Sequence, residues 1–111
     1  MKSNSEHIHQ VTLINWFRDT YPNVLIFSIP NGEYRAISTA VRLKAEGVVS
    51  GIPDLMIPEF KIFIEMKKEK GGRLSKTQKE IIPELERVGY KVIIGYGFED
   101  ARQKLLNLIS N

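Results

Sequence analysis

The chain of 111 residues contains no cysteine and only two histidines. The missing thiols exclude a disulfide-stabilised scaffold and metal sites built from thiolates, and they suit a reducing compartment. No apolar run approaches the roughly 20 residues that a membrane-spanning helix requires. The first residues also lack the apolar core of a signal peptide, which predicts an intracellular protein. What is present is an ordinary globular composition, 42% hydrophobic and 26% charged, that predicts a single domain over residues 1–111.

Positive charge is concentrated in one part of the chain. The overall net charge of +3 is small, yet residues 61–80 carry seven basic side chains against three acidic ones. That segment is therefore +4, and the rest of the chain is about −1. The basic residues are Lys61, Lys67, Lys68, Lys70, Arg73, Lys76 and Lys79. Two interpretations stay open on charge alone: a solvated loop and helix start, or a surface that contacts nucleic-acid phosphates.

Hydrophobic periodicity and turn residues predict an α/β fold, in which a mixed β-sheet is flanked by helices. The expected helices cover residues 5–20, 36–46, 75–88 and 98–110. The expected strands cover residues 24–29, 55–57, 62–64 and 91–97. Ser5 is the expected N-cap of the first helix. In the third helix, Pro83 removes a hydrogen bond and predicts a kink, and the expected apolar stripe is Leu74, Ile81, Leu85 and Val88.

The most informative segment is a short hairpin in the middle of the chain. Two apolar runs, 55–57 and 62–64, flank residues 58–60, and each run is short enough to be a strand. A turn at the centre of this hairpin sets Asp54 opposite Glu65. Facing residues on antiparallel strands have Cβ atoms about 4.5–5.5 Å apart. The sequence therefore predicts two neighbouring carboxylates at the end of the hairpin.

Lys67 joins these two acids because side chains alternate along a strand, so that Glu65 and Lys67 share a face. Two close carboxylates repel, and burial raises the pKa of at least one unless a cation lies between them. Oxygen ligands favour Mg²⁺ or Mn²⁺, held by Asp54 and Glu65 with the carbonyl of Met66. Lys67 would orient an attacking water. The competing interpretation is surface charge on an edge hairpin, although Glu65 follows an apolar run where solvated charge is unusual.

Two polar residues continue the inward face of the first helix. At 100° per residue, Glu6 and Gln10 lie on the same arc as Leu13 and Phe17. Polar groups on such an arc need a partner. Either residue could supply a further ligand to a metal or a water, or Glu6 could be a carboxylate favoured by the positive end of the helix dipole. Both interpretations stay open.

Other polar residues also have two interpretations. Gln78 extends the inward face of the third helix, where it could hold the lysine or a phosphate oxygen near the metal. Ser75 and Gln78 also have the spacing of a capping box. Asn31 and Arg35 form a plain turn with a surface arginine, or contact a DNA phosphate next to the site. The histidines expected at the surface are His7 and His9.

These motifs together resemble the VRR-NUC (virus-type replication-repair nuclease) group of the PD-(D/E)xK nuclease superfamily. The resemblance covers nearly the whole chain, with the motifs in the expected order. Its residues are Glu6, Gln10, Asn31-Gly32, Arg35, 43–47, 50–55, 64–67, Gln78, 89–92 and 98–101. Two features depart from the pattern, Pro83 within a helix and the acidic Glu69 after Lys67-Lys68, and neither removes a motif residue.

The resemblance implies a Mg²⁺- or Mn²⁺-dependent DNA endonuclease with a restriction-endonuclease-like fold. It implies that Asp54 and Glu65 bind the metal, that Lys67 is catalytic, and that Glu6 and Gln78 support the site. The DNA-binding candidates are Lys68, Lys70, Arg73, Lys76, Arg35 and Asn31.

The resemblance also suggests a substrate and an assembly. Stand-alone members of this group resemble Holliday-junction resolvases and tend to be homodimers, since two symmetric cuts need a two-fold pair of sites. This predicts branched DNA as the substrate. The expected location is the cytoplasm of a bacterium or of a phage-infected host. The alternatives are a nuclease directed to flaps, nicks or RNA, and a non-catalytic nucleic-acid-binding domain of nuclease fold.

Overall fold

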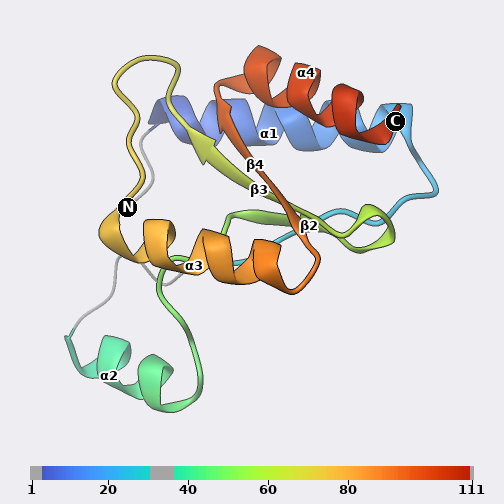
Figure 1. Cartoon of the computed structure of the whole chain (residues 1–111). Coiled ribbons are helices and arrows are strands. Elements are labelled where there is room, and N and C mark those ends of the chain that lie inside the picture. The colour runs from blue at the N-terminus through green and yellow to red at the C-terminus, as the bar shows by residue number, and fades with distance from the viewer. Residues whose placement is uncertain (1–3, 31–36, 111) are drawn as a thin grey trace.

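Four α-helices and four strands follow one another in the predicted order in the computed structural model, which describes residues 4–30 and 37–110 (Figure 1). A 3-10 turn, Pro58–Phe60, connects β2 and β3. They are α1 (Asn4–Thr20), β1 (Phe27–Ser28), α2 (Ile37–Ala45), β2 (Leu55–Ile57), β3 (Ile62–Lys67), α3 (Lys76–Arg87), β4 (Lys91–Tyr96) and α4 (Phe98–Ile109). The predicted α/β class, a mixed sheet flanked by helices, is therefore confirmed. Two candidate DNA-binding residues, Asn31 and Arg35, lie outside the described residues.

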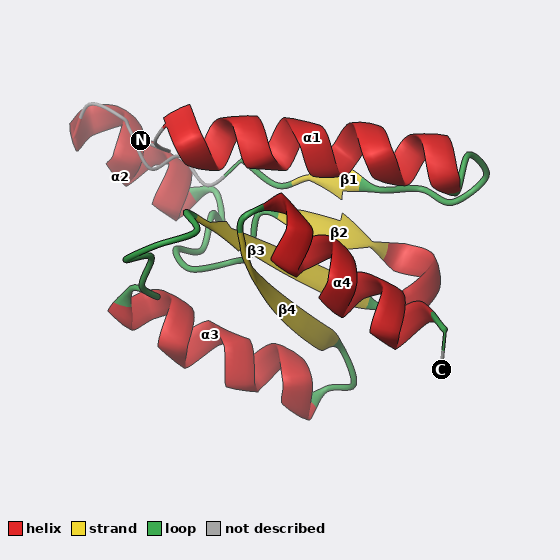
Figure 2. Ribbon diagram, turned by 90° about the horizontal axis from the view of Figure 1, so that it is seen from above, coloured by secondary structure: helices red, strands yellow, loops and turns green. Residues whose placement is uncertain are grey.

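The strands form a single sheet in the order β1-β2-β3-β4 (Figure 2). β2 pairs antiparallel with β1 and β3, whereas β3 and β4 are parallel and are connected through α3. The hairpin has the predicted register, in which Leu55 pairs with Ile64 and Ile57 pairs with Ile62. Continuing this register by one residue sets Asp54 opposite Glu65, as the sequence predicts.

The first strand is much shorter than predicted, covering two residues where 24–29 was expected. Neighbouring backbone groups bind elsewhere: the N–H of Val24 donates to the Tyr21 carbonyl (3.0 Å), and Arg18 donates to the Ile26 carbonyl (3.2 Å). After the strand, the N–H of Ile29 donates to the carbonyl of Asp54 (2.7 Å). That bond continues the sheet to the start of the candidate site.

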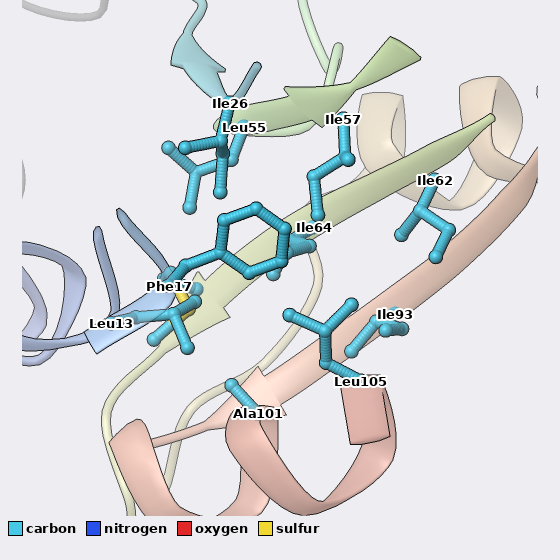
Figure 3. Packing of buried hydrophobic residues seen from close by; sticks show 11 residues of the cluster. Leu13, Phe17, Ile26, Leu55, Ile57, Ile62, Ile64, Ile93, Ala101 and Leu105 are labelled. Atoms are coloured by element: carbon cyan, nitrogen blue, oxygen red, sulfur yellow. The ribbon is translucent and has the colours of Figure 1, made fainter. Parts of the chain in front are cut away.

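The hydrophobic core lies on the face of the sheet that α1 and α4 cover, and α3 lies on the opposite side of the strands (Figure 1). Because side chains alternate, the even-numbered residues of β3 face this core. Figure 3 shows the cluster, with side chains from α1 and α4 meeting those of the strands. Its members are Leu13, Phe17, Ile26, Leu55, Ile57, Ile62, Ile64, Met66, Ile93, Ala101 and Leu105. The odd-numbered residues of β3, including Glu65 and Lys67, face away from it.

Close packing of α4 on β4 requires a glycine at position 95. A Cβ atom on Gly95 would lie 2.4 Å from the Cβ of Ala101, which is closer than two carbon atoms can approach. The helix therefore rests directly on the strand backbone.

Two details of the helices differ from the sequence prediction. α1 begins before Ser5, so that Ser5 lies inside the helix and is not its N-cap. In α3, Ile82 is the buried residue, whereas Val88 is 54% exposed because the helix ends before it. The capping box that begins α3 is present, and Pro83 lies inside that helix. The kink expected at Pro83 stays a prediction.

α2 extends away from the sheet (Figure 1) and buries none of its own side chains. Ile37 and Val41 are strongly exposed, 85% and 64% respectively. Within the described part of the chain, no helix is both long enough and apolar enough to span a membrane.

Candidate functional site

The buried carboxylate of Glu65 is the centre of the candidate site. This residue is only 3% exposed, although it is charged. Burial of an ionised group is costly unless hydrogen bonds and a counter-charge compensate for the lost water. Its Oε2 atom accepts a hydrogen bond from Nε2 of Gln78 (2.9 Å) and lies 3.5 Å from Nζ of Lys67. This burial contradicts the interpretation of Glu65 as surface charge on an edge hairpin.

Asp54, at the start of the other arm of the hairpin, is hydrogen-bonded to β3. Its Oδ2 atom accepts a hydrogen bond from the backbone N–H of Met66 (2.8 Å). The N–H and C=O of a strand residue point to the same edge, so the Met66 carbonyl also faces the edge where Asp54 lies. The carbonyl of Lys67 faces the other edge, where it accepts from the N–H of Gly97 (2.9 Å). The structure thus brings together Asp54, Glu65, Met66 and Lys67.

Gln78 completes the predicted capping box and also contacts Glu65. Its Oε1 atom accepts from the N–H of Ser75 (2.8 Å), and its own N–H donates to the Ser75 hydroxyl (3.2 Å), which completes the capping box. The amide nitrogen of the same side chain donates to Glu65. The helix cap therefore orients the amide toward the carboxylate. The start of α3 and the centre of β3 are connected through this one side chain.

A groove with a volume of about 910 Å³ opens beside the site. Lys67 and Gln78 belong to both the groove and the site. The other lining residues are Ala40, Leu43, Lys44, Gly47, Val48, Val49, Ser50, Gly51, Ser75, Thr77, Glu80 and Ile81. One wall thus comes from α2 and the loop after it, and the other comes from the first turns of α3. The Ser50 and Thr77 hydroxyls meet across it at 3.3 Å.

Four of the candidate DNA-binding residues lie in the segment from the end of β3 to the start of α3. Lys68, Lys70, Arg73 and Lys76 are all exposed, and they follow Lys67 directly in the chain. Their exposure leaves the ammonium and guanidinium groups accessible to a phosphate backbone. Contact with DNA stays a prediction for these four residues.

The supporting residues on α1 have a less definite role. Glu6 and Gln10 are both partly buried, and the Oε1 atom of Gln10 is buried without a hydrogen-bond partner among the described residues. Within residues 4–30 and 37–110, no three His, Cys, Asp or Glu side chains form a metal-binding group. Metal binding by Glu6 therefore stays a prediction.

The donors that the structure gathers fit one hard divalent cation. These ligands are two carboxylates and one backbone carbonyl, and each would bind the cation through oxygen. Mg²⁺ binds through one or two carboxylates together with waters and substrate phosphates, so a complete cage of protein ligands is not needed. Asp54, Glu65 and the Met66 carbonyl would hold such an ion.

His9 was expected at the surface, and this expectation is wrong. Its side chain is only 23% exposed. Its Nδ1 atom accepts the N–H of Phe98 (2.9 Å), and its Nε2 atom lies 3.2 Å from Oε1 of Glu69. Sequence reasoning could not find this pair, because the two partners are far apart in the chain and share no motif.

Comparisons with known proteins give a family match and a fold match. The family model described as the VRR-NUC domain matches residues 3–99. A solved structure titled "VRR_NUC domain protein" is similar with a TM-score of 0.77 and 24% sequence identity, covering 99% of this chain and 92% of that chain. At this level of identity the structural likeness shows a shared fold. None of the curated proteins matches the chain.

Proposed function

This chain belongs to the VRR-NUC domain family of nucleases, and from this premise we propose that it hydrolyses phosphodiester bonds of DNA with the help of Mg²⁺ or Mn²⁺. The observation that carries the proposal is the buried Glu65 carboxylate, bound by Gln78 and 3.5 Å from the Lys67 ammonium. A binding module gains nothing from burying a carboxylate beside a surface meant for phosphates. A nuclease needs such a group to hold its cation.

Asp54 and Glu65, with the Met66 carbonyl, would hold the cation at the end of the hairpin. The ion would supply charge stabilisation at the phosphoryl oxygens and a lower pKa for bound water. Lys67 would orient the attacking water and offset the negative charge that develops on the phosphoryl group. Gln78 would keep the Glu65 carboxylate in one orientation, because its own amide is held by the helix cap.

We propose branched DNA as the substrate, cleaved by a homodimer in the manner of a Holliday-junction resolvase. The exposed Lys68, Lys70, Arg73 and Lys76 support a phosphate-contacting surface next to the site. Two symmetric cuts require two sites related by a two-fold axis, which a homodimer supplies.

The test is a cleavage assay with purified protein and labelled four-way junction, flap, nicked and linear DNA, together with RNA of the same shapes. Each substrate is incubated with Mg²⁺, Mn²⁺ or EDTA. We expect cleavage of branched DNA with either cation and none with EDTA, and a dimer on a sizing column. Cleavage that survives EDTA would exclude the metal mechanism. Binding without cleavage would favour the non-catalytic alternative, and a strict monomer would contradict paired junction cutting.

Replacement of Gln78 with alanine should lower both stability and activity. The variant loses its half of the capping box, about 1 kcal/mol, and it removes the amide donor to the buried Glu65 carboxylate, a further cost of about 1–3 kcal/mol. We also expect a loss of cleavage of about tenfold or more, because Glu65 is no longer held in place. Urea unfolding and single-turnover cleavage measure the two effects.

Ser75→Ala is the matched control for that variant. It removes the hydroxyl that caps α3, yet it leaves the Gln78 side chain intact. We expect a loss of about 1 kcal/mol in the free energy of unfolding and a cleavage rate close to that of the parent. Equal loss of activity in the two variants would mean that the helix cap, and not the bond to Glu65, accounts for the effect.

A further inference from the structure

Two side chains that the proposed mechanism does not use form a bridge beside the site. His9 of α1 accepts the backbone N–H of Phe98 at Nδ1 (2.9 Å), and its Nε2 atom lies 3.2 Å from Glu69. A neutral imidazole has one donor and one acceptor nitrogen. Because Nδ1 accepts, the hydrogen-bond network assigns the proton to Nε2, which donates to Glu69. One ring therefore connects α1, the first residue of α4, and the loop that follows β3.

The backbone beneath this bridge is bonded to the proposed catalytic lysine. The N–H of Gly97 donates to the carbonyl of Lys67 (2.9 Å). A Cβ atom on Gly97 would lie 2.4 Å from Cγ of Glu69 and 3.4 Å from Cε1 of His9, so both bridging side chains pack against this glycine. Its φ of +87° is also unfavourable for other residues. The bridge thus packs on Gly97, the residue whose N–H binds the last residue of β3.

The loop that Glu69 begins folds back against Lys67. A Cβ atom on Gly72 would lie 2.9 Å from Cβ of Lys67 and 2.9 Å from the carbonyl oxygen of Lys68. The side chain of Lys67 is only 12% exposed, whereas Lys68 and Lys70 in the same segment are exposed. Gly72 therefore packs against the base of the Lys67 side chain.

We propose that His9 and Glu69 are positioning residues for Lys67. Their hydrogen bond holds loop 68–74 against the lysine, and so keeps the ammonium near Glu65 in the orientation that the reaction needs. Glu6 lies about one turn before His9 on α1, so the same bridge also holds the turn that carries this candidate metal ligand. The inference rests on the proposed nuclease function and names residues outside the family motif that adjust its site.

The exposure of Glu69 makes the proposal testable without unfolding the protein. Its side chain is 67% exposed, and an interaction at such a solvated position adds little to global stability. Removing the carboxylate should therefore change the loop and leave the fold intact. A purely structural role for the pair predicts the opposite, a lower unfolding temperature with unchanged catalysis by the folded protein.

The experiment compares four changes with the parent protein: Glu69→Ala, Glu69→Gln, His9→Asn, and the double variant His9→Asn with Glu69→Ala. His9→Asn keeps an oxygen acceptor near the N–H of Phe98 but is too short to reach Glu69. Glu69→Gln keeps an oxygen acceptor for the imidazole. Glu59→Ala is the control, because Glu59 is an exposed glutamate in the turn between β2 and β3. The readouts are kcat and KM for cleavage, thermal unfolding, and amide hydrogen exchange of residues 68–72.

We expect Glu69→Ala and His9→Asn each to lower kcat about fivefold to tenfold, the effect of losing one hydrogen bond that holds the transition-state geometry. KM should stay within about twofold, and amide exchange of the loop should accelerate. Glu69→Gln should retain most of the activity. The double variant should be no worse than either single variant, because both remove the same interaction.

Unchanged kcat in Glu69→Ala and His9→Asn, with an active parent, would overturn the inference and leave the nuclease proposal standing. Additive losses in the double variant would also overturn it, because they would show two independent effects. If the parent does not cleave DNA, the nuclease proposal fails and hydrogen exchange still decides the loop restraint. Unchanged exchange of residues 68–72 would then reject the bridge as a positioning device, and faster exchange would support it.

Discussion

Replacing Lys67 with alanine is expected to lower the rate of DNA cleavage by about 10²–10³, the effect of removing one group that stabilises transition-state charge. The ammonium is nearly buried and lies 3.5 Å from the Glu65 carboxylate, so that under the proposed mechanism it would lie beside the reacting phosphoryl group. DNA affinity should change little, because under this proposal the exposed lysines nearby would supply the contacts to phosphates. Single-turnover cleavage and a binding titration measure the two quantities separately.

Lys68→Ala is the matched control, because it removes the same charge from the next residue in the chain. Lys68 is exposed and directly follows the last residue of β3. We expect the cleavage rate of this variant at saturating protein to stay within about threefold of the parent. Its affinity for DNA should fall, and the salt dependence of DNA binding should decrease by about one released ion. Parental activity in the Lys67 variant would refute the catalytic role assigned to that lysine.

Asp54→Asn is expected to abolish most metal-dependent cleavage while the protein stays folded. The amide oxygen of asparagine can still accept the N–H of Met66, which Asp54 now accepts at 2.8 Å. What is lost is the negative charge that would bind a divalent cation. We expect a fall in cleavage of about 10² or more and a weaker calorimetric signal on titration with Mn²⁺. Unfolding in urea should change by less than about 0.5 kcal/mol.

The alanine variant at the same position separates the two roles of Asp54. Asp54→Ala removes both the negative charge and the acceptor for the N–H of Met66. It should lose as much activity as Asp54→Asn, and the free energy of unfolding should fall by roughly a further 1–3 kcal/mol. Glu59→Gln removes a carboxylate in the exposed turn, at the opposite end of the hairpin from Asp54. It should change neither the cleavage rate nor the free energy of unfolding. An Asp54→Asn variant that binds Mn²⁺ and cleaves DNA as the parent does would exclude Asp54 as a metal ligand.

The hairpin shows how far local sequence information reaches. Its register was predictable because two short apolar runs face one core, and a slip of one residue would turn every apolar side chain to the wrong face. The observed pairing of Leu55 with Ile64 has that register. The helix cap at Ser75 was predictable for a similar reason, since the capping box depends on residues three positions apart.

Two errors concern the limits of elements. The strand expected over residues 24–29 shortened because Arg18, from α1, binds the Ile26 carbonyl. The apolar stripe of α3 included Val88, which is exposed because the helix ends one residue earlier. The limit of the strand thus depends on a neighbouring element. The end of α3 is local, because Gly89 has a φ of +103° and the N–H of Tyr90 donates to the Leu85 carbonyl (3.1 Å).

The sequence by itself determined the grouping of Asp54, Glu65 and Lys67, because alternation along a strand and the length of the turn are local properties of the chain. Only the tertiary structure decided that Glu65 is buried, that the amide of Gln78 binds it, and that His9 reaches Glu69. These three facts depend on how α1 and α3 dock against the sheet. Docking of this kind joins residues that are far apart in the chain, and it leaves no periodic signal in the sequence.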